Sequence, residues 1–166
     1  MALDKNGRGI VNGHKIAPEV DLFFADLSGA DLQGADLTGA RLQNTNLSGA
    51  NLSNAKFHGA YMVSADLEGA DLDRASFTGA NLSGADLCQA INLEHVRSFT
   101  GANLMSIAVE EHQVGIIEDI VEKQASDVLQ SLRISIAGQG FRAGLIPYGK
   151  HRTSNPRLHH RRYYGR

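Results

Sequence analysis

Residues 25–39 read Ala-Asp-Leu-Ser-Gly, Ala-Asp-Leu-Gln-Gly, Ala-Asp-Leu-Thr-Gly, three near-copies of one five-residue unit. The unit continues in both directions, so that a large apolar residue, the centre of the unit, recurs at every fifth position from Leu22 to Leu87. From Leu27 onward an alanine lies two positions before each centre, with Thr45 as the exception. A period of five fits neither an α-helix nor a strand, whose side chains repeat every 3.6 and every two residues. It fits a solenoid whose chain turns a corner at each unit and sends one large and one small side chain inward.

This repetition, between about residues 20 and 106, resembles that of the pentapeptide-repeat proteins, whose unit is Ala-(Asp/Asn)-Leu-X-X. The resemblance implies an all-β solenoid, a right-handed quadrilateral β-helix in which four units complete one square coil. About four coils are expected, with an N-terminal hairpin before them and a C-terminal α-helix and extended basic tail after them. The resemblance implies no single function, because proteins that share a fold differ in activity.

The square coil makes a testable demand on the sequence, because residues twenty apart should stack on one face. Phe57 and Phe77 meet this demand on the fourth face. After Leu87 the spacing of the centres lengthens to six residues, giving Leu93 and Phe99. Counting corners through this slip places Phe99 above Phe77, so residues 88–98 are interpreted as a slipped coil that continues the solenoid.

Residues 1–18 do not follow the repeat. Gly9-Ile10-Val11 and His14-Lys15-Ile16 flank Asn12-Gly13, a strong signal for a two-residue hairpin turn. We expect this hairpin to cap the first coil of the β-helix at 19–106; an arm that reaches a neighbouring molecule is the alternative.

Residues 107–133 show the spacing of an amphipathic helix, expected at about 116–132 or from Glu110 with a disturbance at Gly115. Its apolar stripe should dock on the last coil or on a second copy, and it is interpreted as an association helix. The residues assigned to that stripe are Val114, Ile117, Val121, Val128 and Leu132.

Charge divides the chain. Residues 18–106 hold eleven acidic and four basic side chains, whereas residues 133–166 hold eight basic side chains and no acidic one. Residues 134–145 are expected to form a short strand and a loop within an extended tail at 134–166. The basic residues assigned to that tail are Arg142, Lys150, Arg152, Arg157, Arg161, Arg162 and Arg166. The tail should dock on a neighbouring protein surface, either another copy or a larger host subunit, with Ile146, Tyr148, Tyr163 and Tyr164 as anchors.

The outward positions of the rod differ from face to face. The first face carries Phe23, Phe24, Tyr61 and Val63, an apolar strip expected to bind a partner unless the hairpin or the C-terminal segment covers it. The second and third faces are predicted to be acidic. Their residues are Asp26, Asp31, Asp66, Glu68, Asp71, Asp73 and Asp86.

Nothing in the sequence indicates an enzyme, a metal site or a cofactor. The seven histidines lack metal-ligand spacing, and the single cysteine, Cys88, is expected to be an outward-facing surface thiol. The sequence shows neither a membrane-spanning apolar run nor the apolar core of a signal peptide, which favours a cytoplasmic or virion protein.

Three functions compete. The sequence favours a non-enzymatic structural or assembly protein that docks onto other subunits, as a homo-oligomer or in a larger particle such as a virus capsid. The resemblance supplies an alternative, since some pentapeptide-repeat proteins mimic DNA and inhibit or protect type II topoisomerases such as gyrase. Nucleic-acid binding through the basic tail is a third, weaker reading.

Overall fold

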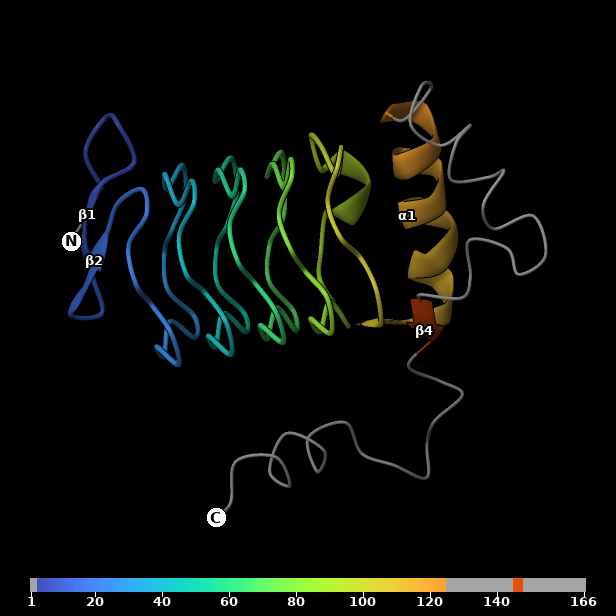
Figure 1. Cartoon of the computed structure of the whole chain (residues 1–166), viewed down its shortest axis with the longest axis horizontal. Helices are drawn as coiled ribbons and strands as arrows, with labels where there is room; N and C mark the ends of the chain where they lie inside the picture. Colours follow the sequence, from blue (N-terminus) through green and yellow to red (C-terminus); the bar gives the residue numbers. More distant parts are fainter. Residues whose placement is uncertain (1–2, 125–144, 148–166) are drawn as a thin grey trace, which may run out of the picture.

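The computed structural model describes residues 3–124 and 145–147. It is a rod of stacked coils with a β-hairpin at one end and a helix at the other (Figure 1). The named elements are β1 (Gly9–Val11), β2 (His14–Ile16), the 3-10 helix η1 (Leu93–His95), β3 (Ile107–Val109), α1 (Glu111–Gln124) and β4 (Leu145–Pro147).

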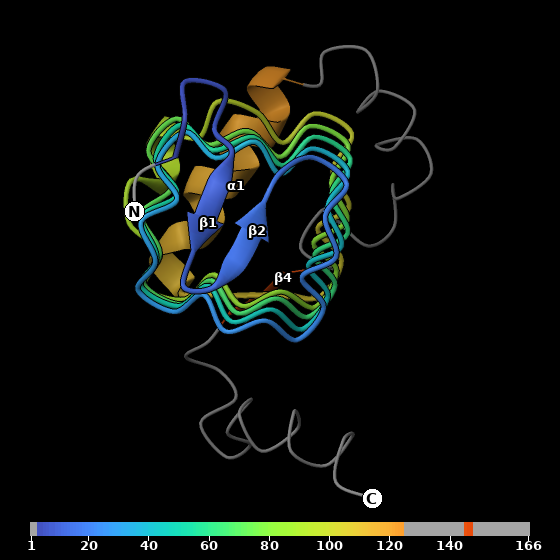
Figure 2. The same ribbon diagram turned by 90° about the vertical axis from the view of Figure 1, so that its left-hand side faces the viewer.

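Parallel bridges join each coil to the next at a spacing of twenty residues. On the first face they run from Asp21 to Arg41, then to Tyr61 and then to Asn81. Figure 2 looks along the rod from its hairpin end and shows square coils in register. The chain circulates clockwise as it recedes from the viewer, which is the right-handed sense. The short bridges, one or two residues on each side of the square, explain why so few long strands are present.

The interior of the rod contains the repeat centres and their alanines. All fourteen centres from Leu22 to Leu87 are buried, and so are the alanines that precede them. Thr45, which replaces one alanine, is also buried, and its hydroxyl donates a 2.7 Å hydrogen bond to the Leu22 carbonyl oxygen. The exception therefore satisfies its polar group inside the core.

The slipped coil is present as predicted. Phe57 stacks on Phe77 with ring centroids 5.0 Å apart, and Phe77 stacks on Phe99 at 5.3 Å. The bridge from Ser76 reaches Ser98, twenty-two residues on, and η1 takes up the two additional residues. The aromatic stack thus keeps the fourth face in register across the insertion.

The corners explain the aspartates of the repeat. Where an Asp or Asn precedes the centre of a regular unit, its Oδ1 accepts a hydrogen bond from the backbone N–H two residues later, as Asp26 does from Ser28 and Asn46 does from Ser48. Ser98 does the same with its hydroxyl oxygen for Thr100. A side-chain oxygen is what the turn needs, because Asn serves as well as Asp.

The hairpin covers the first coil. Asn12 and Gly13 have φ of 50° and 81°, the left-handed pair that a tight hairpin turn requires. Val11 and Ile16 are buried in the same core as the first coil, and the Gly7 carbonyl accepts a 2.9 Å hydrogen bond from the Asp36 N–H. The hairpin therefore caps its own rod, and the alternative of an arm does not describe its position.

The helix covers the last coil. It begins at Glu111, next to the alternative start expected at Glu110, and passes through Gly115 without the expected disturbance. Val114 and Ile117 are buried against this chain's own core, so this part of the stripe docks on the last coil, one of the two expected partners, and caps the rod in place of an association surface. Val121 is half-buried beside them. Val128 and Leu132 lie outside the described residues.

An additional strand joins the last coil. β4 pairs in parallel with β3, with Ala108 opposite Ile146, and Ala108 in turn bridges to Asp86. This pairing adds one further strand to the second face. The sequence predicted the end of a loop and the start of the tail at these residues. The period-five pattern does not continue into β4, so this pairing could not be deduced from it.

Cys88 is buried, and the expectation of an outward-facing thiol was wrong. The first turn of α1 lies over this corner, where the Gln113 amide nitrogen donates to the carbonyl oxygens of Leu87 and Ala90 at 3.1 and 3.2 Å. Burial raises the pKa of the thiol far above its ordinary value, and the nearby carboxylates of Asp86 and Glu110 act in the same direction. Cys88 is therefore a core residue of the C-terminal cap.

Candidate protein-docking surface

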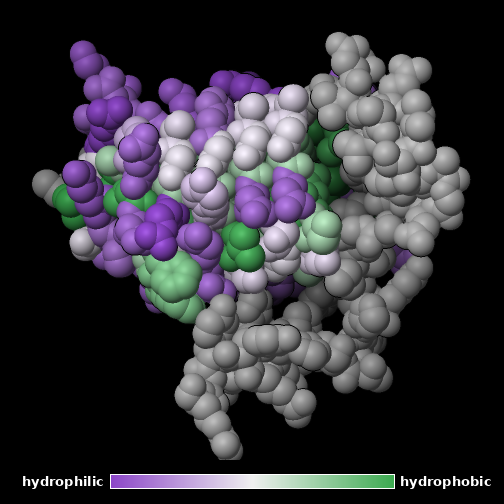
Figure 3. All heavy atoms as spheres, in the orientation of Figure 1, coloured by the Kyte–Doolittle hydropathy of each residue, from purple (hydrophilic) through white to green (hydrophobic). Residues whose placement is uncertain are grey.

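The aromatic strip of the first face, defined by Phe23, Phe24 and Tyr61 with Val63, is exposed along the described part of the chain. Phe23 is 45% exposed, Phe24 51% and Tyr61 52%, while Val63 is half-buried. The rings of Phe23 and Phe24 meet edge to face with centroids 4.3 Å apart. The hairpin caps the end of the rod and does not cover these side chains. Figure 3 shows hydrophobic patches near the hairpin end of this surface, among polar residues.

Phe24 is held in an unfavourable backbone conformation. Its φ is 59°, the left-handed region, which most corresponding corners fill with glycine, as at Gly29, and the others with polar residues, namely Glu19, Asn44, Asn54, Ser64, Arg74 and Gln89. Phe24 is the only aromatic residue with positive φ among residues 3–124 and 145–147. A bulky residue there costs on the order of 1 kcal/mol, and strain of this kind tends to accumulate at functional sites.

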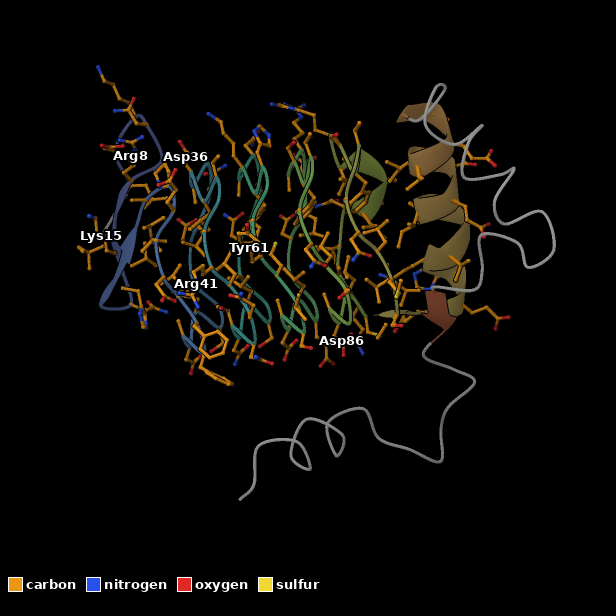
Figure 4. The ribbon with its side chains drawn as sticks, in the orientation of Figure 1. Arg8, Lys15, Asp36, Arg41, Tyr61 and Asp86 are labelled. Carbon is orange, nitrogen blue, oxygen red and sulfur yellow. The ribbon has the colours of Figure 1, made fainter. Side chains whose placement is uncertain are left out.

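Tyr61 continues the strip two coils further along the rod. Between it and the first coil lies Arg41, whose Nη1 is 3.1 Å from Asp21 Oδ2. Figure 4 shows Arg41 and Tyr61 close together on the face turned toward the viewer. Both partners of this ion pair are more than half exposed, so it contributes little to stability. The strip is thus a row of aromatic rings with one neutralised charge pair.

Other exposed apolar residues are scattered. Met105, 64% exposed, lies on the first face of the last coil and was not assigned by the sequence analysis. Its position directly after Leu104 was the available signal. Ile10 and Ile91 are exposed on the hairpin and the third face. Isolated apolar residues of this kind are ordinary, whereas the Phe23–Phe24 pair forms a local cluster.

The acidic ladder of the second face is defined by Asp26, Asp66 and Asp86. Asp66 and Asp86 occupy bridged positions in neighbouring coils, and Asn46 separates Asp66 from Asp26. Glu68 lies directly after the Asp66–Leu67 pair and is half-buried. The Ser28 hydroxyl and N–H lower the pKa of Asp26 through hydrogen bonds. Asp26 is therefore ionised at neutral pH.

The carboxylates of the third face make contacts with neighbouring side chains of the rod. Asp73 lies 3.1 Å from His95 Nδ1 and 3.9 Å from Arg74 Nε. Burial acts to raise the pKa of Asp71, but hydrogen bonds, above all from Asn92 at 2.8 Å, outweigh it and leave the pKa lowered. Asp31, which is exposed, accepts from the Asn51 amide at 3.1 Å. Each of these carboxylates has a partner within the chain.

No group of three or more His, Cys, Asp or Glu side chains suited to a metal ion occurs in the described part of the chain. His58 Nε2 lies 2.9 Å from Ser76 Oγ, and Ser76 is buried in a row of hydroxyl contacts with Thr78 and Ser98 on the fourth face. These contacts link neighbouring coils. No helix within residues 3–124 and 145–147 is long and apolar enough to cross a membrane.

The basic tail residues lie outside the described residues. They are Arg142, Lys150, Arg152, Arg157, Arg161, Arg162 and Arg166.

Comparisons with known proteins agree on one architecture. A family model described as pentapeptide repeats matches residues 21–59 and 55–91, with eight copies of the unit. A pentapeptide repeat protein, Rfr23, from the cyanobacterium Cyanothece 51142 is 37% identical over 55% of this chain and 60% of its own, with a TM-score of 0.52. The pentapeptide repeat protein alr5209 from Nostoc Pcc 7120 is 35% identical over 55% of this chain and 69% of its own, with a TM-score of 0.45.

HetL, a pentapeptide repeat protein involved in heterocyst differentiation regulation in Nostoc sp. Strain PCC 7120, is 37% identical over 54% of this chain, with a TM-score of 0.44. The chain spans 60% of Rfr23 and 38% of HetL. No curated protein sequence matches it significantly.

Proposed function

The chain belongs to the pentapeptide-repeat family, and from that premise we propose that it is a non-enzymatic assembly protein that associates with other protein subunits through the aromatic strip. The coils act as a rigid support, since their interior is continuous from the hairpin to α1. Such a role suits a cytoplasmic or particle-borne protein, including a component of a virus capsid.

The observation that carries this proposal is the Phe23–Phe24 pair. Every repeat centre is buried, so the rod has no structural need for two further aromatic residues at a corner. Corresponding positions in most other units hold small or polar residues, such as Ser28 and Gly29. Two half-exposed rings, one of them in a left-handed conformation, are costly for a free rod and favourable at a protein interface, where aromatic residues dominate the binding energy.

The proposal predicts self-association. The parent chain should exceed its 17.8 kDa monomer mass at micromolar concentrations in sedimentation velocity. A double variant, Phe23→Ser with Phe24→Asn, introduces residues that other coils already carry at these positions, so folding should be preserved. It should remain monomeric at concentrations at least tenfold higher.

The matched control is Ile91→Ser, which removes an exposed apolar side chain from the third face. Its association should equal that of the parent. A double variant that associates as strongly as the parent would refute the role of the strip.

The acidic ladder supports a second candidate, a DNA-mimicking ligand of a type II topoisomerase. Asp66 and Asp86 do align along the rod. However, each aspartate also has a structural role at its corner, and Asn46 breaks the row of charge. A gyrase supercoiling assay with added parent protein separates the two functions: the assembly proposal expects no change in supercoiling rate.

A further inference from the structure

We propose that the aromatic strip of one copy binds residues 148–166 of a second copy, so that two antiparallel chains exchange these segments in a closed dimer. The inference rests on the proposed function, because it names the partner of the same strip. It concerns which part of the second copy lies on Phe23 and Phe24.

The first argument is where the chain leaves the rod. β4 extends the ladder that runs through Asp26, Asp66 and Asp86 by way of Ala108, so Pro147 lies at the far end of the second face. Figure 1 places β4 beside α1, opposite the hairpin. Five ladder steps of ~4.8 Å put about 24 Å between β4 and the coil of Phe23.

This separation favours exchange between copies. Tyr148 follows directly after β4, and one residue spans only ~3.5 Å, so it cannot reach Phe23 of its own chain. In an antiparallel pair of rods, the last coil of one copy lies beside the first coil of the other. Tyr148 of each copy then starts next to the strip of its neighbour, and the remaining residues can follow the neighbour's rod toward Tyr61.

The second argument is complementary chemistry. Residues 148–166 contain six Lys or Arg, three Tyr and no acidic residue. The strip combines aromatic rings with the acidic ladder on the adjacent face, which suits a segment of arginines and tyrosines. Two strips in direct contact would instead bring two acidic ladders together.

The third argument is length and closure. The segment of nineteen residues, 166 minus 147, spans up to ~60 Å when extended, more than the length of the rod. A two-fold exchange gives every copy one donated and one received segment, which closes the assembly at a dimer. Charge guides this association, and the tyrosine–phenylalanine contacts hold it.

The test is complementation between two variants. Chain 1–147 keeps every described element and the strip but lacks the segment. Full-length Phe23→Ser/Phe24→Asn keeps the segment but lacks the strip. Each variant alone should be monomeric at a protein concentration tenfold above the parent's dissociation constant. The mixture should form a 1:1 heterodimer. Its affinity should be at least tenfold weaker than that of the parent dimer, because one of the two segment–strip contacts remains.

A photo-crosslinker in place of Tyr163 in the full-length strip variant supplies a second measurement. It should attach to the Phe23-containing peptide of chain 1–147. A further full-length variant, Arg161→Glu with Arg162→Glu, keeps the chain length and should weaken parent association at least tenfold at low salt.

The alternatives give different results. If chain 1–147 dimerises as tightly as the parent, the strips contact each other; the exchange is then wrong and the proposed function survives. If the parent is monomeric and a parent chain with the same photo-crosslinker at position 163 crosslinks to its own strip, the segment folds back on its own rod and the exchange is wrong. If the parent is monomeric and no crosslink reaches the strip, both proposals fail.

Discussion

The coils at residues 21–87 and the C-terminal cap at residues 88–124 and 145–147 are stabilised in different ways. In the coils every unit repeats a buried centre, most units repeat the corner hydrogen bond, and parallel bridges join each coil to the next at a spacing of twenty residues up to the slipped coil. The cap contains the slipped coil but no regular five-residue repeat, and it depends on single contacts such as those of Gln113 and the β3–β4 pairing. The difference teaches that the structure of the coils is specified by a local sequence pattern. The structure of the cap is specified by contacts between segments that lie far apart in the sequence.

The largest effect is expected from a charge inside the coils. Leu67→Asp buries a carboxylate between the Leu47 and Leu87 centres of neighbouring coils, which should destabilise the rod by about 5 kcal/mol or more and unfold it. Circular dichroism and thermal melting measure the effect. Gln33→Asp adds the same carboxylate at an exposed position and should melt like the parent; equal melting of both variants would show that Leu67 does not face inward.

A smaller, local effect is expected from the cap. Gln113 is buried, accepts from the Glu110 N–H at 2.8 Å and donates to two carbonyl oxygens of the last coil. Gln113→Leu leaves these buried groups without partners and should cost about 2–3 kcal/mol. Hydrogen exchange should show faster opening of α1 while the coils stay protected. The exposed control Gln33→Leu should change neither; uniform loss of protection along the rod would contradict a separately stabilised cap.

The rate of alkylation of the Cys88 thiol measures the same opening of α1. Burial raises the pKa of its thiol, so alkylation of the native chain should stay slow even near pH 9, where an ordinary thiol is largely ionised. Because the folded pKa lies above the unfolded one, this group favours folding below about pH 8.5 and that contribution is lost as pH rises further. Gln113→Leu should accelerate alkylation at least tenfold at temperatures where the coils remain folded. An alkylation rate in Gln113→Leu equal to that of the parent would show that the cap does not shield the thiol.

The smallest effect is expected from the charge of the acidic ladder. Asp86→Asn preserves an oxygen that accepts the Cys88 N–H, as Asn46 and Asn81 do at their own corners, and it removes repulsion with Asp66. The free energy of unfolding should change by no more than about 0.5 kcal/mol. Asp86→Ala loses the corner hydrogen bond and should cost about 1 kcal/mol. Denaturant titration distinguishes these values; a large loss in Asp86→Asn would mean that the carboxylate charge itself stabilises the rod.

Sequence reasoning predicted the coils well because their contacts lie at fixed offsets. The offset of twenty residues places Phe57 under Phe77, and corner counting carried the same logic through the slip to Phe99. It failed at Cys88 because the residues that cover this thiol come from a helix whose docking leaves no periodic trace. The pairing of β4 could not be predicted for the same reason, because it too leaves no periodic pattern in the sequence.

The candidate site was predictable in part. Positions directly after a centre point outward, which identified Phe23 and the exposed strip. The left-handed conformation of Phe24 is equally a consequence of the repeat, since Gly29 holds the corresponding corner, but the aromatic residue there was not recognised as strained. Pairing of Asp73 with His95 could not be seen, because the slipped coil brings them together.

Because the coils repeat every twenty residues, the length of the rod can change independently of the structures of its two caps. The hairpin contacts the first coils and α1 contacts the last, so no contact between the two caps fixes how many coils lie between them. Duplicating residues 41–60 would add one coil and move the caps apart by ~4.8 Å without rotating either. A chain built this way can be lengthened or shortened by whole coils while the surfaces at both ends keep their orientation.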